Sequence, residues 1–303
     1  MKMCNKKKGI TLIEVLVVIM IIGLLITLVL NAVHEARKTA LKLACASNLK
    51  QIGVAVLQYD STFNSLPPAR VGIGYSWLVS ILPQLEQTQL FNTVNLASSN
   101  NTLLSFKLNV FNCPADAVES KNLAPTHYAG NYGSGIQKFG FDGLFHQDKT
   151  IQISNLIDGS SVTSLAAEWL PSMSDSAFPR NSMRTILRTK KTAILAEEFD
   201  DFVQECQNLN FSSSDITTVQ MGRPWTHGHL AHSLYNHSTK PFENRCLNGS
   251  AVQQGAYPPS SMHGSSLNLL FADGHVSTIL KSVSMPVWRA IGTRQGQDLV
   301  EGY

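Results

Sequence analysis

Four histidines lie close together in the segment HGHLAHSLYNH, namely His227, His229, His232 and His237. Histidines at this density are typical ligands of zinc or copper, and a helix would place His229 and His232, three residues apart, on one face. The chain has no HExxH motif and no pair of cysteines at zinc spacing, however, and a polar, histidine-rich surface loop explains the same residues. We predict the surface loop and no bound metal, and keep metal binding as the alternative.

A second group of polar residues, His263, Asp273 and His275, lies near the end of the chain in HGSSLNLLFADGHV. These side chains could form a hydrogen-bonded or metal-binding group. Asp273 and Gly274 are also the strongest hairpin signal in the chain, because Asp and Gly tolerate the left-handed backbone of a tight turn. We therefore predict a structural turn at Asp273 and Gly274, with His263 bonded to the backbone of a loop.

Glu14 is the only charged residue in the apolar run over 10–30. The run is long enough to cross a bilayer as a helix, and longer than the apolar part of a secretory signal peptide. The lysines that precede it place the amino end in the cytoplasm and the rest of the chain outside. A carboxylate within such a helix is costly and generally functional, whereas a charge tolerated at the membrane edge is the plainer alternative.

The five cysteines bear on the compartment of the chain. Cys4 lies in the basic first segment, which leaves Cys45, Cys113, Cys206 and Cys246. Outside the cytoplasm these four favour two disulfides, with three possible pairings, whereas in a reducing compartment they would remain buried thiols. The membrane orientation favours the disulfides.

The elements that position these residues begin with one long helix. Apolar residues continue at spacings of three and four beyond the membrane run, and no proline occurs before Pro67. This pattern predicts one helix over about 10–65. Its apolar face outside the membrane consists of Leu41, Cys45, Leu49, Ile52, Val56, Tyr59 and Phe63.

After Pro68 the sequence predicts a domain of mixed helix and strand, and therefore an α+β fold. Hydrophobic residues make up 44% of the chain and charged residues 15%, which is sufficient for a core. We expect a short amphipathic helix over 78–95 and a loop over 130–143. Strands are expected over 163–167, 192–195, 267–271 and 276–280.

Composition and motifs exclude several classes of function. The first nine residues hold four of the 24 Lys and Arg residues and none of the 21 Asp and Glu residues, so the rest of the chain is nearly neutral. A nucleic-acid partner would need a clustered basic surface and is not expected. The sequence has no nucleophile elbow, P-loop or dinucleotide fingerprint. We expect no enzyme activity, no catalytic residue and no cofactor.

The segment KKKGITLIEVLVVIMIIGLL resembles the prepilin-type leader and N-methylation segment. The resemblance implies that a prepilin peptidase cuts the chain after Gly9 and methylates the new amine of Ile10, where Phe is the commoner residue. Glu14 then corresponds to the glutamate at the fifth position of the mature family members. In a filament it would pair with the Ile10 amine of a neighbouring subunit, because each charge would otherwise be unpaired in a low-dielectric bundle.

The rest of the chain resembles the DUF1559 family of prepilin-type, processing-associated proteins. His263, Asp273 and Gly274 fit its H-x9-DG motif, whereas Asn31 stands where the family often has proline, which implies a straighter helix. The other matching blocks are CASNLKQIGVAVLQYDSTFNSLPP, SWLVSILPQLEQTQLFN, FNCPAD, HYAGNYG and LIDGSSVTSLAAE. No block falls within 171–261, where we expect a variable insertion made of surface loops.

The resemblance implies three parts: a leader over 1–9, a transmembrane and stem helix over 10–66, and a globular domain over 67–303. The helix would pack on a mixed, mainly antiparallel sheet, as in type IV pilins. Cys45 belongs to the apolar face of the helix, and Cys113 begins a rigid Cys-Pro turn suited to meet it. Cys206 and Cys246 lie at opposite ends of the insertion, so we predict the pairs Cys45–Cys113 and Cys206–Cys246.

The implied function is that of a pilin-like subunit, or pseudopilin, of a type II secretion or type IV pilus-like assembly. Its expected partners are the prepilin peptidase, other pilin-like subunits in a homo- or hetero-filament, and the cytoplasmic (inner) membrane. The chain would cross this membrane once, with the domain outside it or on a surface filament. The alternative is a membrane-anchored domain that binds a ligand or metal, or acts as an enzyme, through the His-rich insertion.

Overall fold

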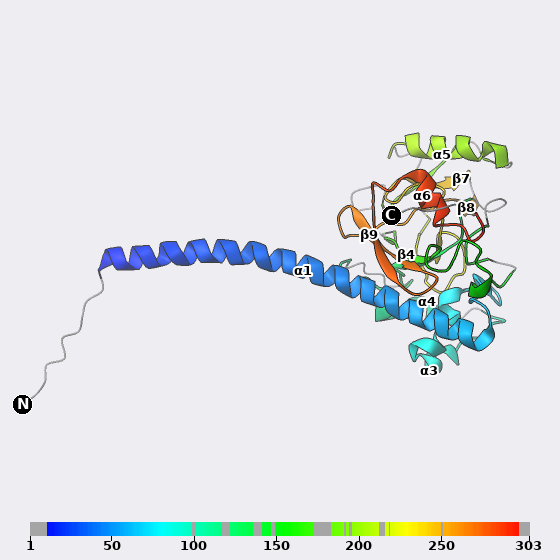
Figure 1. Ribbon diagram of the computed structural model, residues 1–303, viewed down its shortest axis with the longest axis horizontal. Coiled ribbons are helices and arrows are strands. Elements are labelled where there is room, and N and C mark those ends of the chain that lie inside the picture. The colour runs from blue at the N-terminus through cyan, green and yellow to red at the C-terminus, as the bar shows by residue number, and fades with distance from the viewer. Residues whose placement is uncertain are drawn as a thin grey trace, which may run out of the picture. The chain divides into compact units, whose positions relative to one another are not determined.

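The computed structural model (Figure 1) describes residues 11–98, 101–116, 122–135, 141–146, 149–172, 183–190, 192–193, 196–211, 216–217, 219–249 and 251–296. The chain divides into two compact units, Met1–Leu43 and Ala44–Tyr303. One helix, α1 (Leu12–Phe63), contributes to both units. The second unit therefore combines the end of this helix with the domain that follows it.

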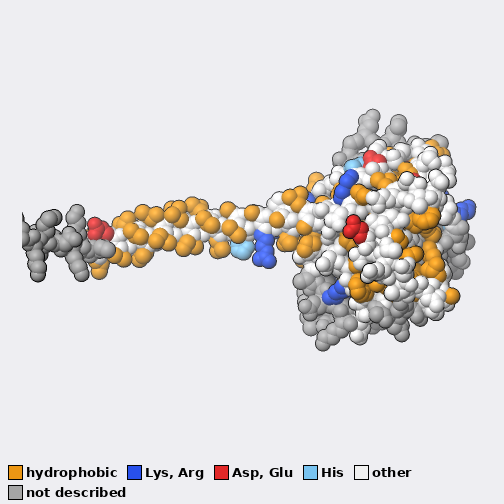
Figure 2. All heavy atoms as spheres, turned by 90° about the horizontal axis from the view of Figure 1, so that it is seen from below, with side chains coloured by type: hydrophobic (Ala, Val, Ile, Leu, Met, Phe, Trp, Pro, Cys, Tyr) orange, Lys and Arg blue, Asp and Glu red, His pale blue; other side chains and the backbone are white. Residues whose placement is uncertain are grey.

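In the first unit, α1 has apolar side chains around its whole circumference. The large hydrophobic residues over 12–30 are between 48% and 83% exposed. Hydrophobic side chains line the face of the helix that Figure 2 presents. A helix that is apolar all round suits a membrane or a helical bundle. By length and composition this segment can span a membrane.

In the second unit, the end of α1 packs on the domain through most of the predicted apolar face, whereas Phe63, expected on that face, is 56% exposed. A Cβ atom on Gly53 would lie 2.7 Å from Leu270 Cδ1, so the absence of a side chain lets the two elements approach closely. The helix ends where Asn64 adopts a left-handed φ of 52°, shortly before Pro67. The buried residues of this face are Cys45, Leu49, Ile52, Gly53, Ala55 and Val56.

A five-stranded sheet of order β10–β9–β4–β3–β6 forms the centre of the domain. Its neighbouring strands are antiparallel except for β3 and β6, which are parallel. The hairpin between β9 and β10 confirms the predicted turn, because Gly274 has a φ of +86°. The strands are β3 (Tyr128–Asn131), β4 (Ser164–Glu168), β6 (Leu234–Tyr235), β9 (Ser266–Phe271) and β10 (Val276–Leu280).

A second sheet of order β5–β7–β8 lies within the segment 171–261, together with helix α5 and a small core of its own. In addition, β6 from this segment joins the main sheet, and Trp225 is fully buried. The prediction of surface loops over 171–261 is therefore wrong. The elements are β5 (Ile186–Arg188), α5 (Phe199–Asn208), β7 (Arg245–Asn248) and β8 (Ala251–Ala256).

Three other local predictions need correction. The helix expected over 78–95 is broken into α2 (Trp77–Ser80), the 3-10 turn η1 (Pro83–Leu85) and α3 (Thr88–Phe91), because Glu86 has a left-handed φ of 61°. Gly130 and Asn131 belong to β3 rather than to a loop. Residues 192–193 are outside any strand, and 194–195 lie outside the described residues.

The short elements that complete the fold are β1 (Arg70–Val71), β2 (Tyr75–Ser76), α4 (Asn101–Ser105), η2 (Asn109–Phe111), η3 (Ile153–Asn155), η4 (Ala196–Glu198) and α6 (Met285–Ala290). β1 and β2 pair as a separate two-stranded sheet. The whole is an α+β fold in which an amino-terminal helix packs on a mixed sheet, as the sequence predicted.

Candidate functional site

Glu14 lies in the first turn of α1 and caps it. The backbone N–H and the hydroxyl of Thr11 donate to Glu14 Oε2 at 2.8 and 2.9 Å, and Glu14 N–H donates to Thr11 Oγ1 at 3.4 Å. These reciprocal bonds form a capping box. The T-x-x-E spacing is visible in the sequence, but an argument based on membrane depth alone misses it. Gly9 and Ile10 lie outside the described residues.

Both disulfides have the predicted pairing. Cys45–Cys113 joins the end of α1 to the Cys-Pro turn, with an S–S distance of 2.00 Å. Cys206–Cys246 joins α5 to β7, with an S–S distance of 2.01 Å. Cys45 is fully buried, so the helical periodicity predicted the direction of its side chain correctly.

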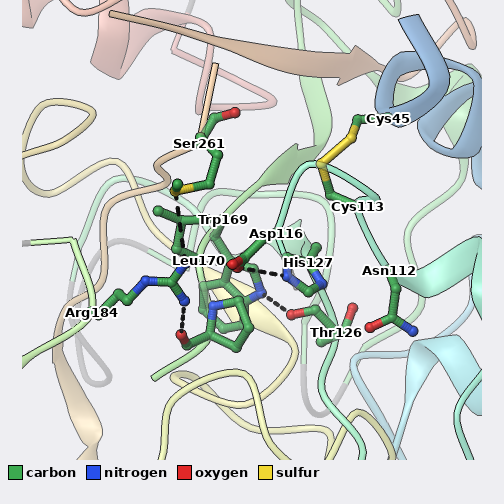
Figure 3. Close-up of polar contacts among 12 residues, drawn as sticks. Cys45, Asn112, Cys113, Asp116, Thr126, His127, Trp169, Leu170, Arg184 and Ser261 are labelled. Carbon is green, nitrogen blue, oxygen red and sulfur yellow. Dashed lines mark hydrogen bonds and ion pairs between the residues drawn. A yellow bond between two sulfur atoms is a disulfide. The ribbon is translucent and has the colours of Figure 1, made fainter. Parts of the chain in front are cut away.

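Side chains from distant parts of the sequence meet beside the Cys45–Cys113 disulfide, which is itself drawn in Figure 3. His263 Nε2 lies 3.6 Å from Cys113 Sγ and 3.6 Å from Glu168 Oε1. Glu168 accepts hydrogen bonds from the backbone N–H and the amide of Asn268 at 2.9 and 2.8 Å. The Glu168 and His263 side chains are 3% and 4% exposed. The atoms that Cys45, Cys113, Glu168 and His263 could offer to a metal lie within 4.8 Å of one another. The two sulfurs are bonded to each other, however, and offer no thiolate to a metal.

His263 lies apart from Asp273 and His275, because β9 separates them. Asp273 Oδ1 accepts from the backbone N–H of His275 at 3.0 Å and lies 2.7 Å from His275 Nδ1. Asp273 and Gly274 thus have the structural turn role that the sequence predicted. The prediction that the His263 ring bonds to a loop backbone is wrong, because the ring faces Glu168 and the disulfide.

A second buried polar group is built on Asp116, at the end of the Cys-Pro turn (Figure 3). Asp116 Oδ2 lies 2.9 Å from His127 Nε2, and Oδ1 accepts from Arg184 Nη2 at 2.7 Å. Burial alone would raise the pKa of Asp116, but the hydrogen bonds from His127 and Arg184 outweigh it and lower the pKa below its usual value. The sequence contained Asp116 and His127 within recognisable blocks, whereas Arg184 carried no signal.

The His-rich segment is not a surface loop. His227, His229 and His232 are partly buried, with ring centroids 5.4 to 6.5 Å apart. Burial lowers the pKa of His229 to about 4 and that of His232 to about 3. His237 is fully buried and lies elsewhere in the core, with Nδ1 2.7 Å from Trp288 O. Three of the four histidines are therefore together and uncharged at neutral pH, and the fourth is a core residue.

A family model described as Protein of unknown function (DUF1559) matches residues 34–285. The chain belongs to the DUF1559 family. A second model, the prokaryotic N-terminal methylation motif, matches residues 4–30. No curated protein and no solved structure matches the chain.

The candidate residues of this DUF1559 protein fall into two groups, one in each matched region. The methylation motif includes Gly9, Ile10 and Glu14, and it implies processing by a prepilin peptidase and pilin-like assembly. The DUF1559 match includes both disulfides and the buried groups around Asp116 and His263. The assembly segment and the polar centre of the domain therefore fall in separate parts of the chain.

Proposed function

We propose that this protein is a pilin-like subunit of a type II secretion or type IV pilus-like assembly. One observation carries the proposal: α1 is apolar around its circumference over 12–30, and Glu14 is the one charged residue there. A simple anchor needs no carboxylate, because any apolar helix would serve. In a filament, the helices of neighbouring subunits would bury this surface, and the Ile10 amine of one would pair with Glu14 of the next.

The proposed topology follows from the charges and the disulfides. The leader lysines remain in the cytoplasm, and the prepilin peptidase cuts after Gly9 and methylates Ile10. The domain lies outside the inner membrane, and its two disulfides suit an oxidising compartment there. The partners are other pilin-like subunits, the membrane and the peptidase.

Substitutions of Glu14 test the assembly role, since Gln keeps the capping box but removes the charge. We expect Glu14→Gln and Glu14→Ala to reach the membrane and to be processed, but to give no cross-linked multimers. The matched control is Glu35→Ala, which removes an exposed carboxylate paired with Lys38 on the same helix. The measurement is the amount of multimer after chemical cross-linking in membranes.

Wild-type amounts of multimer in Glu14→Gln would contradict charge pairing. If only Glu14→Ala lost multimers, the capping bonds to Thr11 would be the essential contribution, and Glu14 would serve the helix rather than the assembly. Loss in the Glu35→Ala control would show that any change of charge on α1 disturbs the multimer.

A further inference from the structure

Arg223 lies in a backbone segment that is fixed on both sides. The Thr126 N–H donates to Gly222 O at 2.9 Å, and the Trp225 N–H donates to Ala124 O at 3.0 Å. Arg223 is 1% exposed, and its Nε, Nη1 and Nη2 atoms have no hydrogen-bond partner in the described part of the chain. A guanidinium keeps its proton in proteins, and an unpaired buried charge is strongly unfavourable. The described residues therefore leave the Arg223 charge without a hydrogen-bonded anion.

Asp116 is the carboxylate whose charge acts on Arg223, but both of its oxygens are engaged by His127 and Arg184. Arg184 Nη1 also donates to Pro171 O at 3.0 Å. Pro171 in turn packs on Gly222, where a Cβ atom would lie 2.8 Å from Pro171 Cβ. Arg184 is thus connected through Pro171 to the backbone next to Arg223. Burial and the charge of Arg184 together lower the pKa of Arg223.

Arg245 adds a third cation to this region. It is fully buried, donates from Nη1 to Leu170 O at 2.8 Å and from Nη2 to Ser260 Oγ at 2.5 Å, and has no carboxylate among these partners. Its charge and that of Arg184 also act on each other. Glu168, two residues before Leu170, accepts its hydrogen bonds from Asn268 and not from Arg245. Among the described residues, Asp116 is therefore the carboxylate that interacts with both Arg184 and Arg223, while Arg245 adds a further positive charge beside Arg184.

We propose that Arg223 and Arg184 bind a small oxoanion, namely phosphate, sulfate or a dicarboxylate. A guanidinium donates two parallel hydrogen bonds to such groups, which match its planar fork. A divalent anion would also balance the excess positive charge. The Arg184 side chain is 12% exposed and gives the cluster an edge toward solvent. This site does not depend on the filament role, because it adds solute binding to the domain.

The test uses the whole protein as it is purified from membranes in detergent. Equilibrium dialysis with labelled phosphate, sulfate and succinate, each against chloride at equal ionic strength, should show saturable binding of at least one of the three. Arg223→Lys keeps the charge but loses the fork, and should weaken binding by roughly tenfold or more. Arg223→Met should abolish binding. Arg188→Met, an exposed arginine on β5, is the matched control and should bind as the wild type does.

Thermal denaturation supplies a second readout. In chloride alone, Arg223→Met should melt at or above the wild-type temperature, because it removes an unpaired buried charge. The bound anion should raise the melting temperature of the wild type but not that of Arg223→Met. The proposal is overturned if the wild type binds none of the three anions saturably, which requires no variant. It is equally overturned if Arg223→Met binds with unchanged affinity, or melts below the wild type in chloride alone.

Discussion

Gly274 is constrained both by its backbone angle and by its close contact with α1. Its φ of +86° is strained for any residue with a side chain, and a Cβ atom there would lie 2.8 Å from Leu57 Cδ1. Its carbonyl accepts a hydrogen bond from Lys50 Nζ at 2.6 Å. The β9–β10 turn is therefore docked on α1 at a point where glycine alone fits without adjustment.

Gly274→Val should lower the free energy of unfolding by more than about 1 kcal/mol, from backbone strain together with the contact to Leu57. Gly264 is the matched control, because it has a φ of +74° but a Cβ atom there would have no neighbour within 4 Å. Urea denaturation of the two Val variants separates the two contributions. An equal loss in Gly264→Val would mean that docking on Leu57 adds nothing.

Residue-level prediction succeeded where a local rule applies and failed where it does not. The turn residues Asp273 and Gly274 could be identified because tight turns need particular backbone angles. The direction of Cys45 followed from helical spacing. Nothing in the sequence distinguishes Arg223 from an arginine on the surface, because its burial depends on neighbours far away along the chain.

At the scale of elements, the long helix and the final hairpin were predictable, since one has sustained periodicity and a terminating Pro67 and the other has a turn between two apolar runs. β6 was not predictable, because its two residues form a strand only by pairing in parallel with β3. The break at Glu86 likewise depends on tertiary packing, which overrides the helical pattern over 78–95.

The histidine segment should make the stability of the protein depend on pH. The folded pKa of His229 is about 4 and that of His232 about 3, against about 6.5 when unfolded, so the unfolded chain binds more protons between these values. The contribution of these two histidines to the free energy of unfolding should be fully present above about pH 6.5. It should fall as the pH approaches 4, by up to about 1.4 kcal/mol per pH unit for each histidine.

Urea denaturation at pH 7 and pH 5 measures this slope. His229→Asn combined with His232→Asn should reduce the slope without abolishing it, because burial also lowers the pKa of His227 and His237. His34→Asn, at an exposed position on α1, is the matched control. An unchanged slope in the double variant would place the pH dependence in other groups.

At the scale of the whole molecule, the proposed processing and the two disulfides can each be tested. Gly9→Val should leave the full-length chain in the membrane, because a branched side chain at the proposed cut would hinder the peptidase. Mass spectrometry of the purified protein identifies the amino terminus. A wild-type terminus at Met1 in cells with an active prepilin peptidase would contradict the processing proposal.

The two disulfides close loops of 68 and 40 residues, and their stabilising effect grows only slowly with loop length. Paired substitution of either set by alanine should therefore lower the free energy of unfolding by about 4 kcal/mol in each case. Urea denaturation of the two double variants provides the comparison. If removal of one pair had no effect, that bond would not constrain the unfolded chain.

The position of Cys45 also has a mechanical consequence. Cys45 is the first buried residue of α1 and is covalently joined to Cys113. A pulling force applied along the amino-terminal part of α1 is therefore transmitted to the domain through a covalent bond at this point. Residues 46–63, with the close contact between Gly53 and Leu270, are shielded from shear. In the reduced chain these non-covalent contacts would bear the load themselves and would yield at a lower force.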